Sequence, residues 1–499
     1  MTTPATEQGR ERVLTREILL LAAVVLLGTI MTILDATIVN VAIPTLGREF
    51  AASISTIQWV STAYLLAFAS VIPLTGWASE RFGAKPVWLA SLILFMLGSA
   101  LAGLSWSIGS LIVFRVLQGL GGGMILPLGQ TMLAQAAGPQ RMGRVMSFIG
   151  VPMLLAPIFG PVIGGAIVDS ASWRWIFFVN LPVGVIALAL AIRLLPSVPR
   201  RAEERLDVRG LALLSGGIAV FVYGLAETGA RGRVTDVVPL TAVLAGLVLV
   251  AAFVLHALAV AKPLIDVRLF MRRGFATAAA TNFLVGTALF GILILLPLYF
   301  QIVRGESPLR TGLLLIPQGL GAACAMPLAG TLTDRIGARF VVVTGMAIAL
   351  AGTAAYTQIA ANSSYWFLSG ALFAVGVGLG STIMPSMAVA YQGLGREEVP
   401  RATSAINTIQ RIAGSLGTAM LAVALQRAIV SELPGLHDGI AEAGALARRD
   451  PAHATPLLAH AFGTTFVVAL VLAAVAVVPA ALLPRRRNDA QPSMRTATS

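Results

Sequence analysis

Charged residues are scarce in this chain. Only 11% of its 499 residues are Asp, Glu, Lys or Arg, whereas soluble domains average about 25%. So few charges cannot hydrate the surface of a globular protein of this length. The composition therefore excludes an ordinary soluble domain, and the hydrophobic share of 57% indicates a membrane protein.

Cysteines and catalytic clusters are also scarce. Cys324 is the only cysteine and lies in an apolar run, which excludes an intrachain disulfide and a multi-cysteine metal site. His437, His453 and His460 have no metal-ligand spacing. No Gly-x-x-x-x-Gly-Lys-Ser/Thr phosphate loop is present, and the glycines at 119–123 lie within an apolar run. We therefore expect no metal, no cofactor and no enzymatic activity.

Long apolar runs recur between residues 18 and 483, and each is long enough to cross a bilayer as a helix. Backbone groups find no partners in lipid, so spanning segments are helices or parts of a closed barrel. These runs lack the polar alternation of barrel strands. The sequence predicts an all-α polytopic membrane protein with fourteen spans, at 18–43, 54–75, 87–105, 108–134, 145–168, 174–195, 208–227, 237–258, 275–302, 311–332, 340–360, 366–391, 402–428 and 457–483.

The basic residues lie mostly on one side of these predicted spans, and this asymmetry predicts that both termini are cytoplasmic. Frequent Arg, Ala and Gly suggest a GC-rich bacterial genome, and hence the bacterial inner membrane. The net charge of +13 and the pI of about 11.1 then reflect cytoplasmic loops, and we expect no nucleic-acid partner. The hydrophilic segment 431–456 becomes an outer loop.

One loop sequence occurs twice. The order Gly, acid, Arg, Gly, Ala, base follows the second predicted span and recurs after the tenth. Two homologous six-span halves would place the second copy after span 8, so spans 7 and 8 read as an inserted pair. Such repeats mark transporters with a substrate site between the halves. The predicted parts are a tail at 1–17, a first half at 18–196, loops with the inserted pair at 197–274, a second half at 275–483 and a tail at 484–499.

These motifs resemble those of the major facilitator superfamily, and the fourteen spans resemble its EmrB/QacA-type drug:proton antiporters. The repeated loop looks like the superfamily's cytoplasmic loop motif, at Gly76, Glu80, Arg81, Gly83 and Lys85 and again at Gly330, Asp334, Arg335, Gly337 and Arg339. The first span is similar to the family's at Leu34, Asp35, Thr37, Asn40 and Pro44, and the entry to the sixth at Trp173, Arg174, Asn180 and Pro182. The resemblance implies a superfamily fold of six, two and six helices.

Asp35 and Arg115 are the main candidates for proton coupling. An acid inside a span is costly, so Asp35 must be protonated, paired or in contact with water. Its alternative role is a structural polar contact. Arg115 lies in a segment that resembles the family's fourth-span motif, where the arginine is linked to proton transfer. Because arginine keeps its proton, Arg115 would tune a neighbouring acid, or else pack against helix carbonyls. Glu227, at the end of span 7, is a weaker coupling candidate.

The fifth span and the repeated loops are candidates for conformational coupling. Pro157, Gly160, Pro161, Gly164 and Gly165 resemble the superfamily's antiport motif, and small residues four apart let helices approach closely. The alternative is an ordinary Gly- and Pro-rich membrane helix. In the loops, an acid and adjacent arginines form a candidate lock for the cytoplasmic side, or else a plain positive-inside anchor. Glu80 stands where the family usually has aspartate, and Ala84 where it has a base.

Other polar side chains inside the spans are candidates for a substrate cavity, or else ties between helices. They are Asn40, Gln58, Tyr64, Gln118, Asn282, Tyr299, Asn407 and Arg411.

The sequence and the resemblance together predict proton-coupled efflux of drugs or antibiotics, with protons as the coupling ion. The expected partners are a hydrophobic or amphipathic small molecule and the lipid bilayer, and the protein is expected to be monomeric. One alternative is a proton-coupled carrier or importer of a metabolite with the same fold. A membrane enzyme or sensor would need a catalytic cluster or a sizeable soluble domain, and the sequence contains neither.

Overall fold

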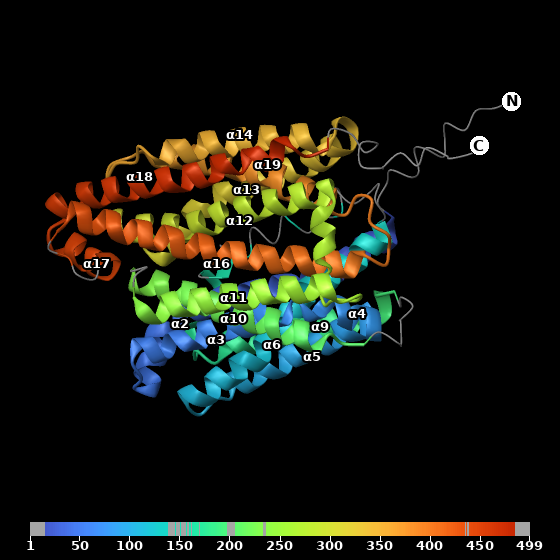
Figure 1. Ribbon diagram of the computed structural model, residues 1–499. Helices are drawn as coiled ribbons and strands as arrows, with labels where there is room; N and C mark the ends of the chain where they lie inside the picture. Colours follow the sequence, from blue (N-terminus) through green and yellow to red (C-terminus); the bar gives the residue numbers. More distant parts are fainter. Residues whose placement is uncertain are drawn as a thin grey trace, which may run out of the picture.

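The computed structural model describes residues 15–137, 145, 150, 156, 159–160, 162–168, 170–196, 205–232, 236–434, 436 and 439–484. Over these residues the chain is helical and contains no strand. The helices lie side by side, roughly along one direction, in two groups (Figure 1). This arrangement confirms the predicted all-α class.

The first half contains α2 to α9, as far as the structure describes it. The helices are α2 (Arg16–Phe50), α3 (Ile54–Val71), α4 (Leu74–Phe82), α5 (Ala84–Gly103), α6 (Ile108–Ala137), α8 (Trp175–Phe178) and α9 (Asn180–Leu194). Between α3 and α4 the direction changes by 55° at Pro73, whose ring removes a backbone donor. The predicted span 54–75 therefore crosses as a bent pair.

The inserted pair is α10 (Val208–Arg231) and α11 (Val237–Ala259). The second half then contains η1 (Val267–Met271), α12 (Arg273–Leu298), η2 (Tyr299–Val303), α13 (Pro308–Ile336), α14 (Ala338–Tyr356), α15 (Tyr365–Ala390), α16 (Val399–Glu432), α17 (Gly439–Arg449), α18 (Pro451–Val475) and α19 (Val477–Ala481).

Polar residues start several of these helices. Thr15, Ser53 and Ser307 precede α2, α3 and α13, and each side-chain oxygen accepts a hydrogen bond from a backbone N–H of the first turn. Such caps satisfy donors that have no partner within the helix. Asp207 caps α10 at Gly210 and also accepts hydrogen bonds from His256 of α11 and from the Leu264 N–H, which ties the two inserted helices together.

Twelve of the described helical segments are long and apolar enough to cross a membrane, and the bent pair gives a thirteenth. They coincide with thirteen of the fourteen predicted spans. Only half of the remaining one, 145–168, lies within the described residues, so the count of fourteen stays a prediction.

A helix lies in the predicted outer loop 431–456. α17 places Ile440, Ala443 and Leu446 against the apolar cluster at that end of the second half. These residues recur every three positions, the spacing of one helix face. Because the other residues of this short segment are small or charged, it lacks the long apolar run that marks a span.

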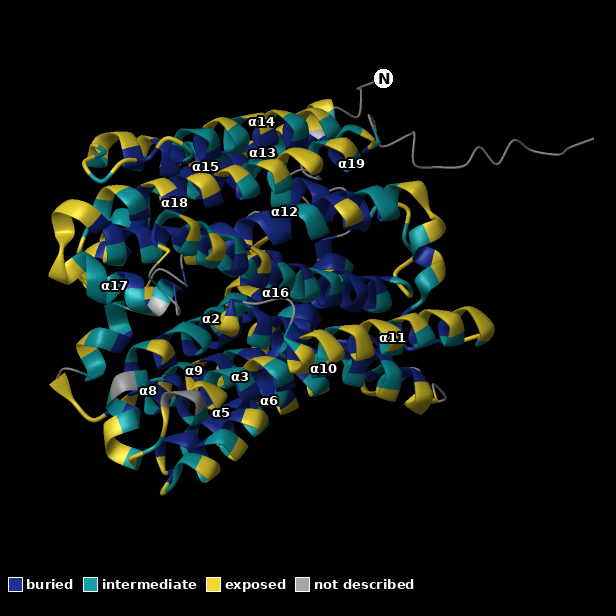
Figure 2. Cartoon of the chain, turned by 60° about the vertical axis from the view of Figure 1, so that its left-hand side comes forward, coloured by how far each residue is buried: buried dark blue, intermediate teal, exposed yellow. Residues whose placement is uncertain are grey.

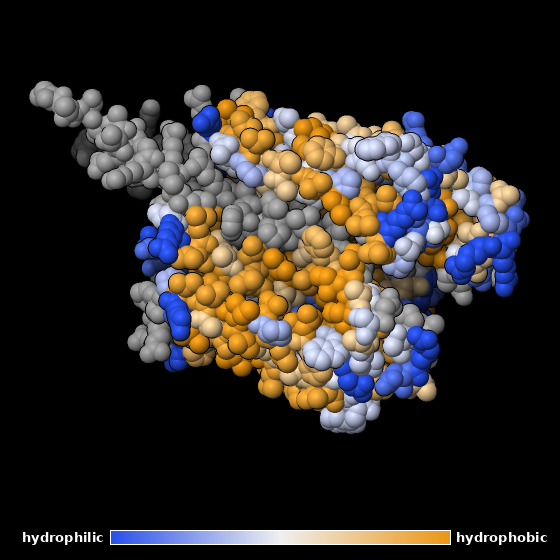
Figure 3. Space-filling view, turned by 180° about the vertical axis from the view of Figure 1, so that it is seen from behind, coloured by the Kyte–Doolittle hydropathy of each residue, from blue (hydrophilic) through white to orange (hydrophobic). Residues whose placement is uncertain are grey.

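The outer surface carries a broad apolar belt between two polar ends (Figure 3). Buried residues face inward, whereas many outward-facing residues of α11 are exposed (Figure 2). On this helix Val248 and Leu255 expose 66% and 71% of their surfaces. Apolar side chains so exposed suit contact with lipid, as expected for a spanning helix.

Candidate functional site

Asp35 lies at the centre of a buried polar cluster in the first half. Its carboxylate accepts hydrogen bonds from Arg115 Nη1 at 2.5 Å, Gln118 Nε2 at 2.8 Å and Asn180 Nδ2 at 2.9 Å. These donors belong to α6 and α9, and Asn180 also bonds Ser99 of α5. Asp35 is fully buried. Of the three states expected for an acid inside a span, this structure has the paired one.

Arg115 is as deeply buried as its partner. It also donates to Gln118 Oε1 at 2.7 Å and, through Nε, to the backbone carbonyl of Val60 at 3.1 Å. Its guanidinium lies 4.0 Å from the centre of the Tyr64 ring. Among the residues that the structure describes, its Nη2 has no hydrogen-bond partner. Arg115 thus both pairs with the acid and bonds a helix carbonyl, so these contacts leave both alternatives open.

The glycine run 119–123 brings α6 close to α3. A Cβ atom at Gly119 would lie 2.5 Å from the Tyr64 carbonyl oxygen, and one at Gly123 would lie 2.3 Å from that of Phe68. No larger residue fits at these separations. The glycines therefore serve helix packing, and this close approach places Arg115 against the Tyr64 ring.

Protonation would change the electrostatics of this cluster. In the paired state the charges of Asp35 and Arg115 cancel within a fully buried site. A proton on the carboxylate would leave the arginine without a counter-charge, and breaking a buried pair in this way costs about 3–5 kcal/mol. A proton on Asp35 would therefore disturb the hydrogen bonds that join α2 to α6 and α9.

Glu80 joins the two halves at the end of the molecule that holds the turns 82–84 and 336–338, here named the motif end. It accepts hydrogen bonds from Arg401 of α16 at 2.9 and 3.2 Å. Beside it, the Ser404 hydroxyl donates to the Ile72 carbonyl at 2.9 Å. A Cβ atom at Gly76 would lie 3.2 Å from the Arg401 Cα. The halves are in direct contact here, through α4 and α16.

Two further contacts strengthen the motif end. Asn407 of α16 donates to Gln130 Oε1 of α6 at 2.7 Å, again between the halves. Within the second half, Arg272 forms an ion pair with Glu398 at 2.5 Å. The Arg272 guanidinium holds the pKa of Glu398 below its usual value, because it stabilises the charged carboxylate.

The two copies of the loop motif share a backbone conformation. Gly83 and Gly337 end α4 and α13 with φ angles of 92° and 94°, a region that favours glycine. Lys85 donates to the carbonyls of Ile192 and Leu195, both at 2.8 Å. It thereby binds the carbonyl end of α9, where a positive charge is favourable. The matched φ angles of Gly83 and Gly337 support the predicted repeat.

The other residues of the loop motif differ in their surroundings. Arg335 is exposed, Arg81 and Arg339 are half-buried, and Gly330 is buried. The side chain of Asp334 lies outside the described part of the structure. The acid of the first copy is thus placed between the halves. For the second copy, the described feature is the turn at Gly337.

Gly160 and Gly164 of the antiport motif pack against α2. A Cβ atom at Gly160 would lie 1.9 Å from Thr37 Oγ1, and one at Gly164 would lie 3.1 Å from the Ile38 carbonyl oxygen. Gly165 faces open space within 4 Å. This contact lies directly after Asp35, so the segment can sense a shift of α2. The motif residues Pro157 and Pro161 lie outside the described residues.

The predicted cavity residues do not form one group. Tyr64 and Gln118 belong to the Asp35 cluster, and Asn407 and Arg411 face the first half from α16. Asn40 and Gln58 are exposed, Asn282 bonds its own helix, and Tyr299 donates to the Ala360 carbonyl. Glu227 pairs with Arg231 at 2.9 Å, with 28% of its side chain exposed. No contact of Glu227 with the Asp35 cluster is seen among the described residues.

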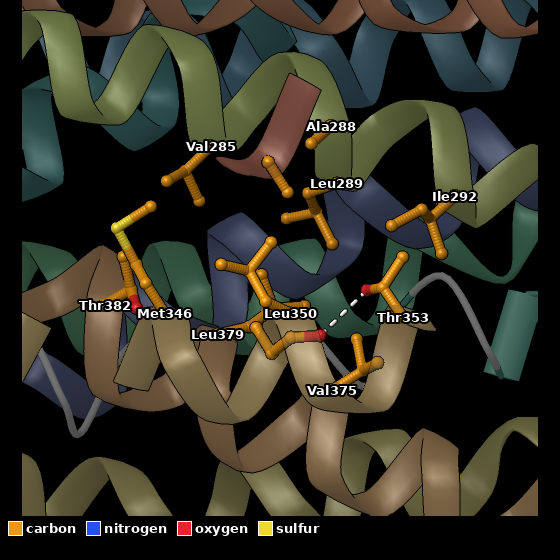
Figure 4. A pocket seen from close by; sticks show the side chains of 12 residues that line it. Val285, Ala288, Leu289, Ile292, Met346, Leu350, Thr353, Val375, Leu379 and Thr382 are labelled. Atoms are coloured by element: carbon orange, nitrogen blue, oxygen red, sulfur yellow. Dashed lines mark hydrogen bonds between the residues drawn. The ribbon is translucent and has the colours of Figure 1, made fainter. Parts of the chain in front are cut away.

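A small pocket lies within the second half (Figure 4). Val285 and Leu289 of α12, Met346 of α14 and Leu379 of α15 line it, and the Thr353 hydroxyl points to its own helix. The pocket is lined by no charged residue and by none of the predicted cavity residues. It supplies no chemistry comparable to that of the Asp35 cluster.

Sequence reasoning missed several participants. Asn180 stood in a segment that resembles the family, but its bond to Asp35 was not predicted. Arg401 counted only as one basic loop residue among many. In the sequence, Arg401 is distinguished only by its position at the start of a predicted span, directly after a loop.

Comparisons with known proteins agree with this architecture. The model of the Major Facilitator Superfamily matches residues 25–418. A multidrug resistance protein B homolog of Mycobacterium tuberculosis is 39% identical over 485 residues, which cover 93% of this chain and 90% of the relative. The multidrug export protein EmrB of Haemophilus influenzae is 32% identical, with 81% of this chain and 79% of the relative covered.

A solved structure extends the comparison to the fold. The proton:xylose symporter XylE superposes with a TM-score of 0.57 at 16% sequence identity, over 92% of this chain and 96% of that one. At this identity the likeness shows the helical fold alone.

Proposed function

This chain belongs to the major facilitator superfamily, and from that premise we propose that it exports drugs or antibiotics from bacteria in exchange for protons. The observation that carries the proposal is the buried Asp35–Arg115 pair with its amide donors. The relatives that are named for multidrug resistance and export support the choice of substrate. The protein then has no enzymatic activity, binds no cofactor besides the coupling proton, and acts in the inner membrane as a monomer.

The conformation of the motif end supports an alternating-access cycle. The positive-inside argument assigns this end to the cytoplasm. Its contacts through Glu80, Arg401 and Ser404 then hold the cytoplasmic side closed, as in an outward-facing state. A proton that reaches Asp35 releases Arg115, the helices shift, and the contacts at the motif end separate. The inward-facing state loses the proton and binds the drug.

The antiport motif supplies the mechanical link in this proposal. Gly160 and Gly164 pack directly on α2 beside Thr37 and Ile38, two to three residues beyond Asp35. A movement of α2 therefore reaches the fifth predicted span without an intermediate element. The Lys85 contact with the end of α9 links the first loop motif to the helix that carries Asn180.

Asp35→Asn tests the coupling step. The amide cannot gain or lose a proton in the working pH range, so proton-driven export should fall by at least tenfold, while a drug gradient should still drive exchange. Inverted membrane vesicles with an acidic lumen measure the first activity, and drug counterflow without a pH gradient measures the second.

Glu49→Gln is the matched control for this test. Glu49 lies on the same helix, is exposed, and pairs only loosely with Arg174 at 3.4 Å. It should leave both activities unchanged. Full proton-driven export by an Asp35→Asn protein present at normal membrane levels would rule out Asp35 as the coupling site. Accumulation in the opposite direction would favour an importer.

A further inference from the structure

Arg411 places a positive charge between the two halves. It lies on α16, about 18 Å along the helix axis from the first residue at 1.5 Å per residue, and hence deep within the membrane. Its side chain is only half-buried. The guanidinium lies 4.3 Å from the centre of the Phe68 ring of α3, in the other half. The charge therefore lies at the seam where the halves meet, on a side chain that keeps part of its surface exposed.

This charge differs from that of Arg115 in having no carboxylate partner. Across the described residues, no ion pair and no side-chain hydrogen bond forms at the Arg411 guanidinium. The nearby acid Asp35 is bonded to Arg115, and Glu80 accepts from Arg401. A cation–π contact contributes about 0.5–2 kcal/mol but leaves the charge in place. An uncompensated charge inside a membrane points to a functional role.

The two arginines lie on neighbouring aromatic rings of one helix. Arg115 lies over Tyr64 and Arg411 over Phe68, and the centres of the two rings are 5.8 Å apart. The first arginine is neutralised by Asp35, so the net charge of this array is positive. The two rings themselves are buried, and the unneutralised guanidinium of Arg411 favours an anion over a lipophilic cation.

We propose that Arg411 binds the acidic group of the exported compound, and that the preferred substrates are amphipathic aromatic anions. This inference rests on the proposed export function and adds its substrate class. The guanidinium offers several donors in a fixed plane, which suits a carboxylate or sulfonate. The aromatic part of the compound would lie beside Arg411 at the seam between the halves.

Two dyes that differ in a single group test the preference. 8-Anilinonaphthalene-1-sulfonate and N-phenyl-1-naphthylamine share their ring system, but only the first carries a sulfonate, which stays charged at every working pH. Uptake is measured by filtration and extraction in inverted vesicles with an acidic lumen, against vesicles that lack the protein. Wild-type protein should transport the sulfonate at least tenfold faster than the neutral dye.

Variants at Arg411 assign the preference to this side chain. Arg411→Gln should lower transport of the sulfonate at least tenfold and leave transport of the neutral dye unchanged. Arg411→Lys, which keeps the charge, should retain part of the sulfonate transport. Arg427→Gln is the matched control, because Arg427 is an exposed arginine later on the same helix. Membrane levels and gel-filtration profiles of each variant show whether it folds.

The possible failures are distinguishable. If wild-type protein exports compounds in a drug-susceptibility panel but transports the neutral dye as fast as the sulfonate, or transports neither, the inferred anion preference is wrong while the exporter proposal stands. An equal loss of both dyes in a folded Arg411→Gln protein would make Arg411 structural. If the panel shows no Asp35-dependent export of any compound, the proposed function itself fails.

Discussion

At the scale of single residues, function concentrates in a few charges whose partners differ. Asp35 and Arg115 neutralise each other at 2.5 Å, while Arg411 has no carboxylate partner among the residues that the structure describes. The contrast matters because protonation of the acid in a buried pair removes the attraction within that pair. An arginine without a carboxylate partner instead attracts an anion. One helix, α3, presents aromatic rings to both arginines, so the two charges are close enough to influence the same substrate.

Arg115→Lys separates the charge of this residue from its geometry. Lysine keeps the positive charge but has one compact ammonium group. It cannot bond Asp35, Gln118 and the Val60 carbonyl together while it also covers the Tyr64 ring. We expect proton-driven export in inverted vesicles to fall by about tenfold or more, with normal amounts of protein in the membrane.

Arg193→Lys is the control for that substitution. Arg193 lies on α9 and is exposed, so the exchange should be neutral. Wild-type export by Arg115→Lys would mean that charge alone suffices at this position and that the hydrogen-bond geometry is dispensable.

The sequence predicted the members of this site better than their contacts. Asp35 is conspicuous because an acid stands out in an apolar run. Asn180 is not, because an amide within a span serves equally well to tie two helices together. That Arg411 has no carboxylate partner in the described part of the chain was beyond prediction, since this depends on how distant segments of the chain pack around it.

At the scale of helices, α4 and α16 bring the two halves into contact at the motif end. The loop motif predicted a lock made of an acid and adjacent arginines. The partner of Glu80 in the structure is Arg401, 321 residues further along the chain. Local pattern cannot reveal such a partner, because it becomes a neighbour only when the halves assemble. The repeated glycine turns, by contrast, were visible as sequence and share φ angles within 2°.

Glu80→Gln should weaken this contact and expose the seam behind it. In a background with Cys324→Ser, Ser404→Cys provides a reporter, because Ser404 is fully buried beneath the start of α4. Loss of the Glu80 charge removes the ionic part of its bonds to Arg401, so the inward-open state should become more populated. We expect the rate of maleimide labelling at position 404 to rise several-fold.

An exposed acid provides the comparison for that experiment. Glu17 lies near the start of α2 and is exposed, so Glu17→Gln should not change labelling at position 404. An unchanged rate in Glu80→Gln as well would show that the Glu80–Arg401 pair does not hold this end closed.

At the scale of the whole molecule, the inserted pair joins the two halves. Trp59 of α3 stacks on Tyr223 of α10 with ring centres 5.8 Å apart, and Phe221 and Leu225 of α10 pack against Ala419 of α16. The repeat predicted that a helix pair is inserted. The repeat could not predict that α10 would contact both halves. Such contacts depend on which faces of α10 pack against α3 and α16.

Export of an anion against protons would make the whole cycle electrogenic. An anion that leaves and a proton that enters together move at least two charges inward per cycle, whereas a monovalent cation exchanged for one proton moves none. Each charge gains about 2.3 kcal/mol per 100 mV. In inverted vesicles without a pH gradient, a lumen-positive potassium diffusion potential set with valinomycin should therefore drive uptake of 8-anilinonaphthalene-1-sulfonate. Reversal of the potassium gradient should suppress this uptake, and vesicles without the protein correct for passive entry of the dye. Uptake that is independent of the sign of the potential would contradict the combination of anionic substrate and proton antiport. This holds even if the anion preference and the proton coupling had each passed their separate tests.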